Sequence, residues 1–121
     1  MNMKTSIRQV GNVSIVDISG RIVLGEECAT LRAVVRDLLE DGRKNILLNL
    51  GMVDYIDSSG LGNLISAYAS VRKQGGELKL LKLTNKVHDL LQITKLFTVF
   101  DIMDDESLAV GSFDQTVAAT A

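Results

Sequence analysis

Short apolar runs, separated by glycines and polar turns, divide this chain into strands and helices. In residues 13–18 the apolar side chains roughly alternate with polar ones, which is typical of a strand with one buried face. Gly11-Asn12 favours a tight hairpin turn before this strand, and Gly20 is predicted to close it. The run 45–50 is nearly continuous in apolar residues, which indicates a strand covered on both faces. The predicted strands are residues 4–9, 12–19, 45–50, 77–81 and 99–102.

Apolar residues at helical spacing predict four helices between and after these strands. The first begins near Gly25 and ends at Gly42, the second begins near Ser58, and the third has Thr84 as its N-cap. The fourth is a brief helix over residues 104–111 with an acidic start. The side chains expected to face the core are Cys28, Leu31, Val35, Leu38 and Leu39 in the first helix, Leu61, Leu64, Ile65, Tyr68 and Val71 in the second, and Val87, Leu90 and Leu91 in the third.

The order of these elements predicts an α/β fold. The strand–helix–strand run from residue 45 to residue 81 requires a parallel pair, whereas the N-terminal hairpin is antiparallel. We therefore expect one domain with a mixed β-sheet of about four or five strands and about four helices, and with at least one sheet face partly open. The tail from Ser112 is small, polar and aperiodic, so we expect it to be loose.

Composition narrows the class of protein. At 121 residues the chain is long enough for one domain with one hydrophobic core, and its 46% hydrophobic and 23% charged residues are those of an ordinary globular protein. A formal net charge of −2 without a basic cluster argues against a nucleic-acid partner. The single cysteine, Cys28, is expected to be buried and fits a reducing compartment. Since no apolar run approaches the length of a membrane span, we expect a cytoplasmic protein with no membrane partner.

The most unusual stretch runs from Asp54 to Gly62, where an acid and two serines precede Gly-Leu-Gly. It contains half of a nucleophile elbow, but the glycine two residues before Ser58 is absent. A serine hydrolase would also need a base, and the only histidine, His88, is expected on a solvated helix face. The third glycine of a dinucleotide-binding motif and a Walker lysine are missing as well. We therefore expect no catalysis, no metal site and no cofactor.

The start of the predicted second helix has a structural explanation and a functional one. In the first, Asp57 or Ser58 is a helix N-cap, and Gly60 and Gly62 merely allow close packing. Capping does not account for three consecutive small polar residues followed by two glycines, which are both costly inside a helix. Glycines here leave the helix end without bulky side chains, which favours contact with another protein.

Phosphorylation of Ser58 would turn such a contact into a switch. A phosphate adds about 1.5–2 negative charges, and the amides and dipole of a helix N-terminus tolerate an anion, so the fold should survive. In a dry interface an unpaired charge costs on the order of 3–5 kcal/mol, enough to turn a nanomolar complex into a micromolar one. The stretch therefore predicts a reversible phosphorylation site on a protein-binding module.

Residues 54–62, Asp-Tyr-Ile-Asp-Ser-Ser-Gly-Leu-Gly, closely resemble the phosphorylation-site signature of bacterial anti-sigma factor antagonists, which are STAS domains. The resemblance covers about residues 4–110, and it implies a STAS domain over residues 1–111 with a flexible tail over 112–121. The other segments that match, in the family's order, are residues 46–50, 75–78, 87–91 and 96–97.

The resemblance implies a partner-switching role in transcription regulation. An unphosphorylated antagonist binds an anti-sigma factor that is also a serine kinase, and the sigma factor is freed. Phosphorylation of the first serine of the pair, here Ser58, dissociates the complex, and a serine phosphatase resets the site. The residues implied to form the partner contact are Asp57, Ser58, Ser59, Gly60, Leu61 and Gly62.

The sequence departs from the family at one position, and two other hypotheses stay open. Many relatives carry an acid shortly after the glycine that ends the second strand, but Val23 stands there in this chain, so either Glu26 or Glu27 substitutes or the partner differs. One alternative is a STAS-like scaffold or accessory subunit of a transporter or signalling assembly, in which Ser58 is only a cap. The other is a ligand-binding domain, which would need a pocket.

Overall fold

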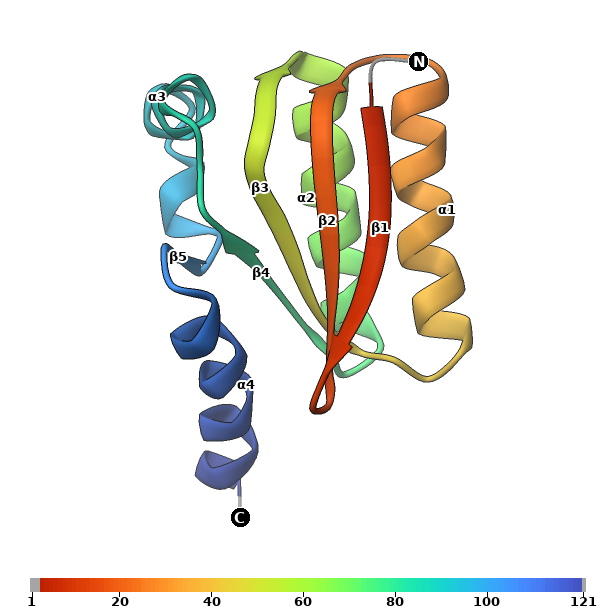
Figure 1. The fold of residues 1–121 in the computed structure, drawn as a ribbon, viewed down its shortest axis with the longest axis vertical. Helices are drawn as coiled ribbons and strands as arrows, with labels where there is room; N and C mark the ends of the chain where they lie inside the picture. Colours follow the sequence, from red (N-terminus) through yellow and green to blue (C-terminus); the bar gives the residue numbers. More distant parts are fainter. Residues whose placement is uncertain (1–2, 121) are drawn as a thin grey trace.

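The computed structural model describes residues 3–120 of the chain, with side chains described for residues 3–113. Strands and helices alternate after an N-terminal hairpin (Figure 1). The elements are β1 (Met3–Val10), β2 (Val13–Ile22), α1 (Glu26–Glu40), β3 (Asn45–Ile56), α2 (Ser58–Lys73), β4 (Glu77–Leu81), α3 (Asn85–Ile93), the short 3-10 helix η1 (Leu96–Thr98), β5 (Ile102–Met103) and α4 (Glu106–Thr120).

The strands form one mixed sheet in the order β1-β2-β3-β4-β5. β1 is antiparallel to β2, and every later neighbour pair is parallel. The hairpin turns at Gly11-Asn12, where Gly11 adopts a φ of +60° that suits glycine. The five-stranded mixed sheet and the four α-helices confirm the predicted fold class.

Helices α1 and α2 cover one face of the sheet and form the main core with it (Figure 1). The five core positions predicted for α1 are all buried. In α2 the prediction for Ile65 is wrong, because its side chain is 38% exposed. The buried stripe of α2 instead follows Leu61, Leu64, Ala67 and Val71, so Ile65 lies at its edge.

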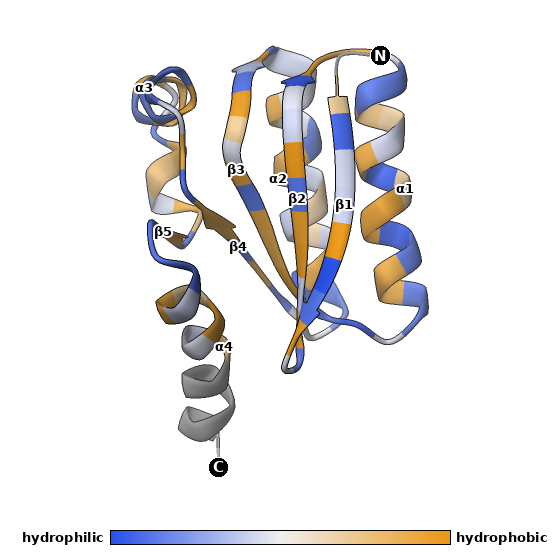
Figure 2. Cartoon of the chain, viewed as in Figure 1, coloured by the Kyte–Doolittle hydropathy of each residue, from blue (hydrophilic) through white to orange (hydrophobic). Residues whose placement is uncertain are grey.

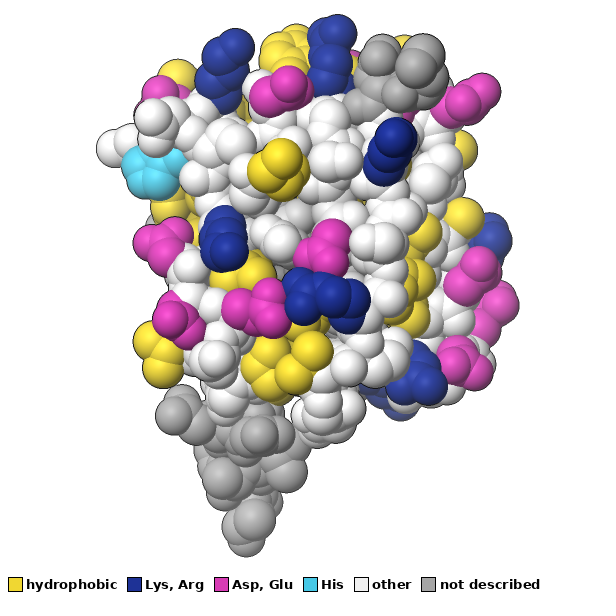
Figure 3. All heavy atoms as spheres, viewed as in Figure 1, with side chains coloured by type: hydrophobic (Ala, Val, Ile, Leu, Met, Phe, Trp, Pro, Cys, Tyr) yellow, Lys and Arg dark blue, Asp and Glu magenta, His cyan; other side chains and the backbone are white. Residues whose placement is uncertain are grey.

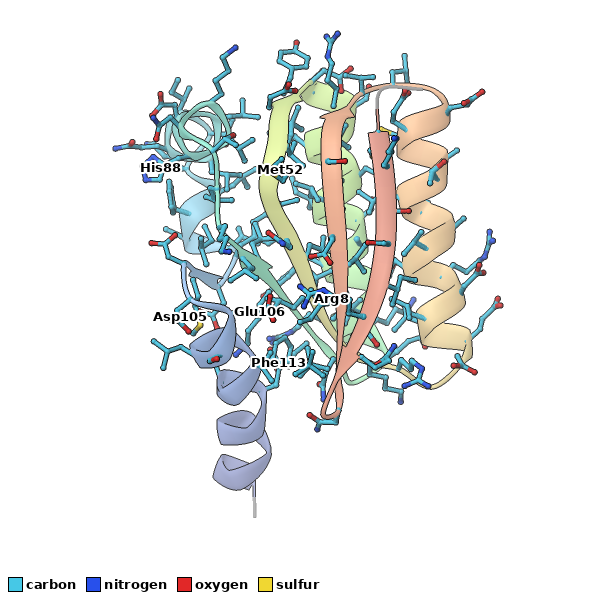
Figure 4. The ribbon with its side chains drawn as sticks, in the orientation of Figure 1. Arg8, Met52, His88, Asp105, Glu106 and Phe113 are labelled. Atoms are coloured by element: carbon cyan, nitrogen blue, oxygen red, sulfur yellow. The ribbon has the colours of Figure 1, made fainter. Side chains whose placement is uncertain are left out.

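Helix α4 packs against the other face of the sheet, where a smaller apolar cluster lies. Residues of one strand alternate between the two faces, so Val16 joins the main core while Ile15 joins this second cluster. Phe113 of α4 is 1% exposed and points toward the sheet (Figure 4). The buried members of the second cluster are Val13, Ile15, Leu47, Leu81, Ala109 and Phe113.

Beyond α4 this sheet face is open, as the half-buried pattern of the N-terminal strands predicted. The space-filling view shows charged side chains of both signs on this face, with hydrophobic ones among them (Figure 3). The strands alternate in hydropathy along their length (Figure 2). Met52 stands on this face with 72% of its surface exposed, and Arg8 lies beside Glu106 of α4 (Figure 4).

Two predicted strand ends are wrong, and they are neighbours in the sheet. β2 continues past Gly20 to Ile22, because Gly20 adopts a φ of +100° and the register shifts there, as in a β-bulge, without ending the pairing. β3 continues past Leu50 to Ile56 and pairs with this extension of β2. The segment between the predicted strand and the predicted second helix, residues 51–57, is therefore mostly strand, and only Asp57 separates β3 from α2.

The C-terminal prediction is correct in kind but not in extent. The last strand is Ile102–Met103 rather than residues 99–102, and the last helix runs Glu106–Thr120 rather than ending at Gly111. Ser112 and Phe113, assigned to the tail, belong to that helix, because Phe113 buries its ring against the sheet. The flexibility expected of the tail stays a prediction, and the side chains after Phe113 lie outside those described.

Candidate functional site

Asp57 joins the end of β3 to the start of α2 and is the N-cap of the helix. Its backbone is extended, with φ −90° and ψ −178°, and its Oδ1 accepts a hydrogen bond from the Gly60 amide at 2.7 Å. Oδ2 accepts a second hydrogen bond, at 3.0 Å, from the amide of Leu24 in the β2–α1 connection. The carboxylate therefore fastens two segments that are far apart in the sequence.

The same hydrogen bonds lower the pKa of Asp57. The Gly60 amide has the largest effect and the Leu24 amide the next; desolvation opposes them, while the Ser59 amide and the charge of Arg21 add to the lowering. The carboxylate is therefore ionised at neutral pH, and its charge lies directly beside Ser58.

Ser58 is the first residue of α2, and its side chain is exposed. Of the two residues that the sequence offered as the N-cap, the structure selects Asp57. Ser59, the next residue, is half-buried. The pair therefore presents one accessible hydroxyl-bearing residue at the helix start, at the top of the view in Figure 1.

The glycines of the motif have different surroundings. Gly60 is buried, and a Cβ built on it would overlap the carbonyl oxygen of Ile22, so the close approach of helix and strand requires glycine there. Gly62 is exposed, and a Cβ built on it would meet no atom within 4 Å. Leu61 is 9% exposed and belongs to the core. Packing thus explains Gly60 and Leu61, while Gly62 has no packing reason.

The surface around Ser58 includes residues that sequence reasoning missed. Leu24 is 73% exposed, although its amide is held by Asp57. Tyr55 is 43% exposed, and the guanidinium of Arg21 lies over its ring, 4.9 Å from the centroid. Arg21 and Tyr55 are partners in the β2–β3 register. Their contact arises from the pairing of two distant segments, so no local motif could have revealed it.

The position of the missing acid lies close to this surface. Val23 is half-buried, and its carbonyl accepts a hydrogen bond from the Cys28 amide at 3.3 Å. Glu26 is the first residue of α1 and is exposed, two residues beyond the Leu24 that binds Asp57. The structure therefore brings Glu26 to the same end of the sheet as Ser58, and its substitution for the acid stays a prediction.

Asn63 is a further structural residue that the sequence did not reveal. It is 6% exposed, and its Nδ2 donates a hydrogen bond of 2.8 Å to the carbonyl oxygen of Cys28. This hydrogen bond connects α2 to α1 close to the candidate site. An amide side chain among apolar residues could have predicted this role, because a buried amide needs a hydrogen-bond partner.

The chemistry-bearing residues outside this segment have ordinary surroundings. Cys28 is 4% exposed, as predicted, and desolvation raises the pKa of its thiol, with the charge of Asp57 adding to the effect. His88 is exposed, as predicted, and its ring makes an edge contact with Phe97 at 4.7 Å between centroids. Within the described residues, no group of three His, Cys, Asp or Glu side chains is placed to hold a metal ion. None of the described helices combines the length and apolarity needed to cross a membrane.

Comparison with known proteins identifies the family. The STAS domain model matches residues 4–109, so the chain belongs to the STAS domain family. It is 35% identical over 102 residues to the anti-sigma-B factor antagonist of Bacillus subtilis, a match covering 84% of this chain and 92% of that protein. It is 30% identical over 108 residues to the anti-sigma F factor antagonist of Paenibacillus polymyxa, covering 88% and 91%.

The fold is also that of a solved family member. The crystal structure of an anti-sigma factor antagonist from Mycobacterium paratuberculosis superposes with a TM-score of 0.80. That match covers 93% of this chain and 94% of the other, at 20% sequence identity, and it bears on the fold alone.

Proposed function

We propose that this chain is an anti-sigma factor antagonist whose binding to an anti-sigma factor is controlled by phosphorylation of Ser58. One observation carries the proposal: Ser58 is exposed at the start of α2, while the neighbouring Asp57 does the capping. The helix does not need the Ser58 hydroxyl, so modification can change the surface without removing a structural contact. The similarity to two named antagonists supports the same role.

The contact surface for the anti-sigma factor consists of the start of α2 and the neighbouring β2–α1 connection. Exposed Leu24 and Tyr55 supply apolar area, and Gly62 lets a partner approach the helix closely. Gly60 and Leu61 are buried beneath this surface, and they position it through their packing. Glu26 supplies a carboxylate at its edge.

The modification is a phosphoryl transfer in which this chain is the substrate. The Ser58 hydroxyl oxygen attacks the γ-phosphorus of ATP bound to the anti-sigma factor kinase, the bond to the β-phosphate breaks, and ADP leaves. A base of the kinase takes the hydroxyl proton. A serine phosphatase later transfers the phosphoryl group to water and restores the hydroxyl.

The new dianion lies beside the ionised Asp57 in a surface that the partner must desolvate. An unpaired charge in such an interface costs on the order of 3–5 kcal/mol, which corresponds to roughly a thousandfold loss of affinity. Phosphorylation therefore releases the partner.

The test uses the cognate histidine-kinase-like anti-sigma factor with ATP. Intact mass should show the gain of one phosphate, and peptide mapping should place it on Ser58. Ser58→Asp should fail to bind this partner, while Ser58→Ala should bind but not be released by ATP; Ser59→Ala is the matched control and should still gain one phosphate and be released by ATP. Equal binding by wild type and Ser58→Asp would reject the switch in favour of a non-switching scaffold.

A further inference from the structure

The start of α2 already holds one anion, the carboxylate of Asp57, which caps the helix. Asp57 Oδ1 accepts a hydrogen bond from the Gly60 amide at 2.7 Å, and the Leu61 amide donates the first regular helix hydrogen bond to the Asp57 carbonyl at 2.9 Å. Tolerance of a phosphate was expected from free amides at the helix start, but Asp57 already engages the Gly60 amide and places its own negative charge there. A phosphate on Ser58 therefore needs another source of positive charge.

The segments around Ser58 contain few cations. Residues 20–29 and 53–62 hold the acids Glu26, Glu27, Asp54 and Asp57, and a single cation, Arg21. On the neighbouring strand β1, the first described cation is Lys4. It pairs with Ser19 of β2, which lies two residues before Arg21, so Lys4 is further from this end of the sheet than Arg21 is. A dianion on Ser58 would thus enter a region already rich in negative charge.

Arg21 lies where its side chain can reach a phosphate on Ser58. Ile22, the next residue, accepts a hydrogen bond from the Asp57 amide at 3.2 Å, so Arg21 lies beside the segment that leads into Ser58. The Arg21 side chain is exposed and lies over Tyr55, three residues before Ser58. An exposed cation–aromatic contact is weaker than a charge-assisted hydrogen bond to phosphate, so such a bond can displace it.

We propose that Arg21 is the intramolecular counter-ion of phosphorylated Ser58, and that it leaves the ring of Tyr55 to bind the phosphate. This inference rests on the proposed function, because it assumes that Ser58 carries phosphate in the cell. Phosphorylation then changes the contact surface twice: it adds a dianion, and it withdraws a cation from above an exposed tyrosine.

The test installs phosphoserine at position 58 of the full chain by encoded incorporation, so it needs no kinase. The second pKa of the phosphoserine, ordinarily about 6, is measured by phosphorus NMR. Arg21→Gln should raise this pKa by at least about 0.5 unit, because a nearby cation favours the dianion. The same substitution at Arg36, an exposed α1 residue beside Asp37, is the matched control and should leave it unchanged.

A competing cation is tested in the same way. Lys86 stands in the first turn of α3, which Thr84 holds to the Val53 carbonyl of β3 by a hydrogen bond of 2.7 Å. Lys86→Gln should shift the phosphoserine pKa less than Arg21→Gln does. An Arg21→Gln shift no larger than that of Arg36→Gln or Lys86→Gln overturns the inference.

A second readout follows the Tyr55 ring directly. Its proton resonances should shift on phosphorylation of the otherwise wild-type chain and should not shift in the Arg21→Gln background. Identical shifts in both backgrounds also overturn the inference. Neither measurement depends on the partner. If no kinase phosphorylates the chain, the proposed function is therefore rejected, whereas the pairing of Arg21 with the phosphate is not.

Discussion

The backbone carbonyl of Ile22 lies directly against Gly60, the third residue of α2. A Cβ at Gly60 would come closer than 3.0 Å to this oxygen, and the same oxygen accepts the Asp57 amide at 3.2 Å. The end of β2 therefore fixes the start of α2, and with it the position of Ser58. The site is held by backbone contacts rather than by a flexible loop.

Replacing Gly60 with alanine should destabilise the protein. The added methyl group meets backbone, which cannot move without disturbing the Asp57 contact, so we expect a loss of about 1–3 kcal/mol in the free energy of unfolding. Gly62→Ala is the matched control on the same helix; it meets no neighbour and should gain about 0.5–1 kcal/mol. Urea denaturation of both variants measures the difference, and equal effects would refute the close approach.

Gly62→Ala also separates stability from partner contact. The variant should be at least as stable as wild type yet bind the anti-sigma factor more weakly, because its methyl group intrudes on the contact surface. Unchanged affinity, measured by isothermal calorimetry, would mean that Gly62 lies outside the interface.

Substitution of Ser58 should hardly change stability. Asp57 caps the helix, so Ser58→Ala and Ser58→Asp should each unfold within about 0.5 kcal/mol of wild type. Thr84→Ala is the contrasting variant: Thr84 caps α3 and also binds the Val53 carbonyl, so about 1 kcal/mol or more should be lost. A loss in Ser58→Ala as large as that in Thr84→Ala would mean that the hydroxyl is structural.

Local patterns predicted the helices and the motif well. The stripe from Cys28 to Leu39 is buried as its spacing indicated, because one helix face packs on one sheet face. The motif located Ser58, but composition alone left open whether Asp57 or Ser58 was the cap, since both residue types serve. The hydrogen bond from the distant Leu24 amide also engages Asp57, and no local pattern reveals it.

The errors occur where distant segments decide the outcome. Gly20 predicts a strand end locally, yet pairing with β3 carries β2 past it. No prediction was made for Lys79, the charged residue between Leu78 and Leu80 of β4. Helix α4 covers that position and leaves Lys79 only 4% exposed. A sequence pattern cannot show which late element will cover an early strand.

Lys79 provides another prediction. Its ammonium lies beneath α4, 2.8 Å from Ser112 Oγ, 3.4 Å from Asp101 Oδ2 and 4.8 Å from the centroid of the Phe113 ring. Lys79→Ala should cost about 2–4 kcal/mol, because it empties space under the helix. Lys79→Met keeps the volume and removes a buried charge, so it should cost far less. Thermal unfolding compares the two, and equal losses would show that the charge rather than the packing holds α4.

The last prediction concerns the ionic contacts that join α4 to the open sheet face. Arg8 of β1 binds Asp17 of β2 at 2.6 Å. It also binds Glu106 of α4 at 2.8 Å, and Figure 4 shows these two residues close together. Hydrogen bonds from Arg8 are the largest cause that lowers the pKa of both carboxyls, against a smaller opposing effect of desolvation. Since the folded-state pKa lies below the ordinary values of 3.8 and 4.5, this stabilisation is complete above those values and is lost as the pH falls through the folded ones.

Arg8→Gln should therefore weaken the dependence of protein stability on pH in the acid range. At pH 7 we expect a loss of no more than about 1 kcal/mol, because the contacts are largely exposed. Between roughly pH 5 and pH 2 the variant should lose less stability than wild type, so the two melting temperatures should converge in acid. Arg36→Gln, which removes only an exposed contact of 3.3 Å with its neighbour Asp37, should run parallel to wild type. If Arg8→Gln also runs parallel to wild type, the carboxyls are not held by Arg8 in solution, and α4 depends on its apolar cluster and Lys79 alone.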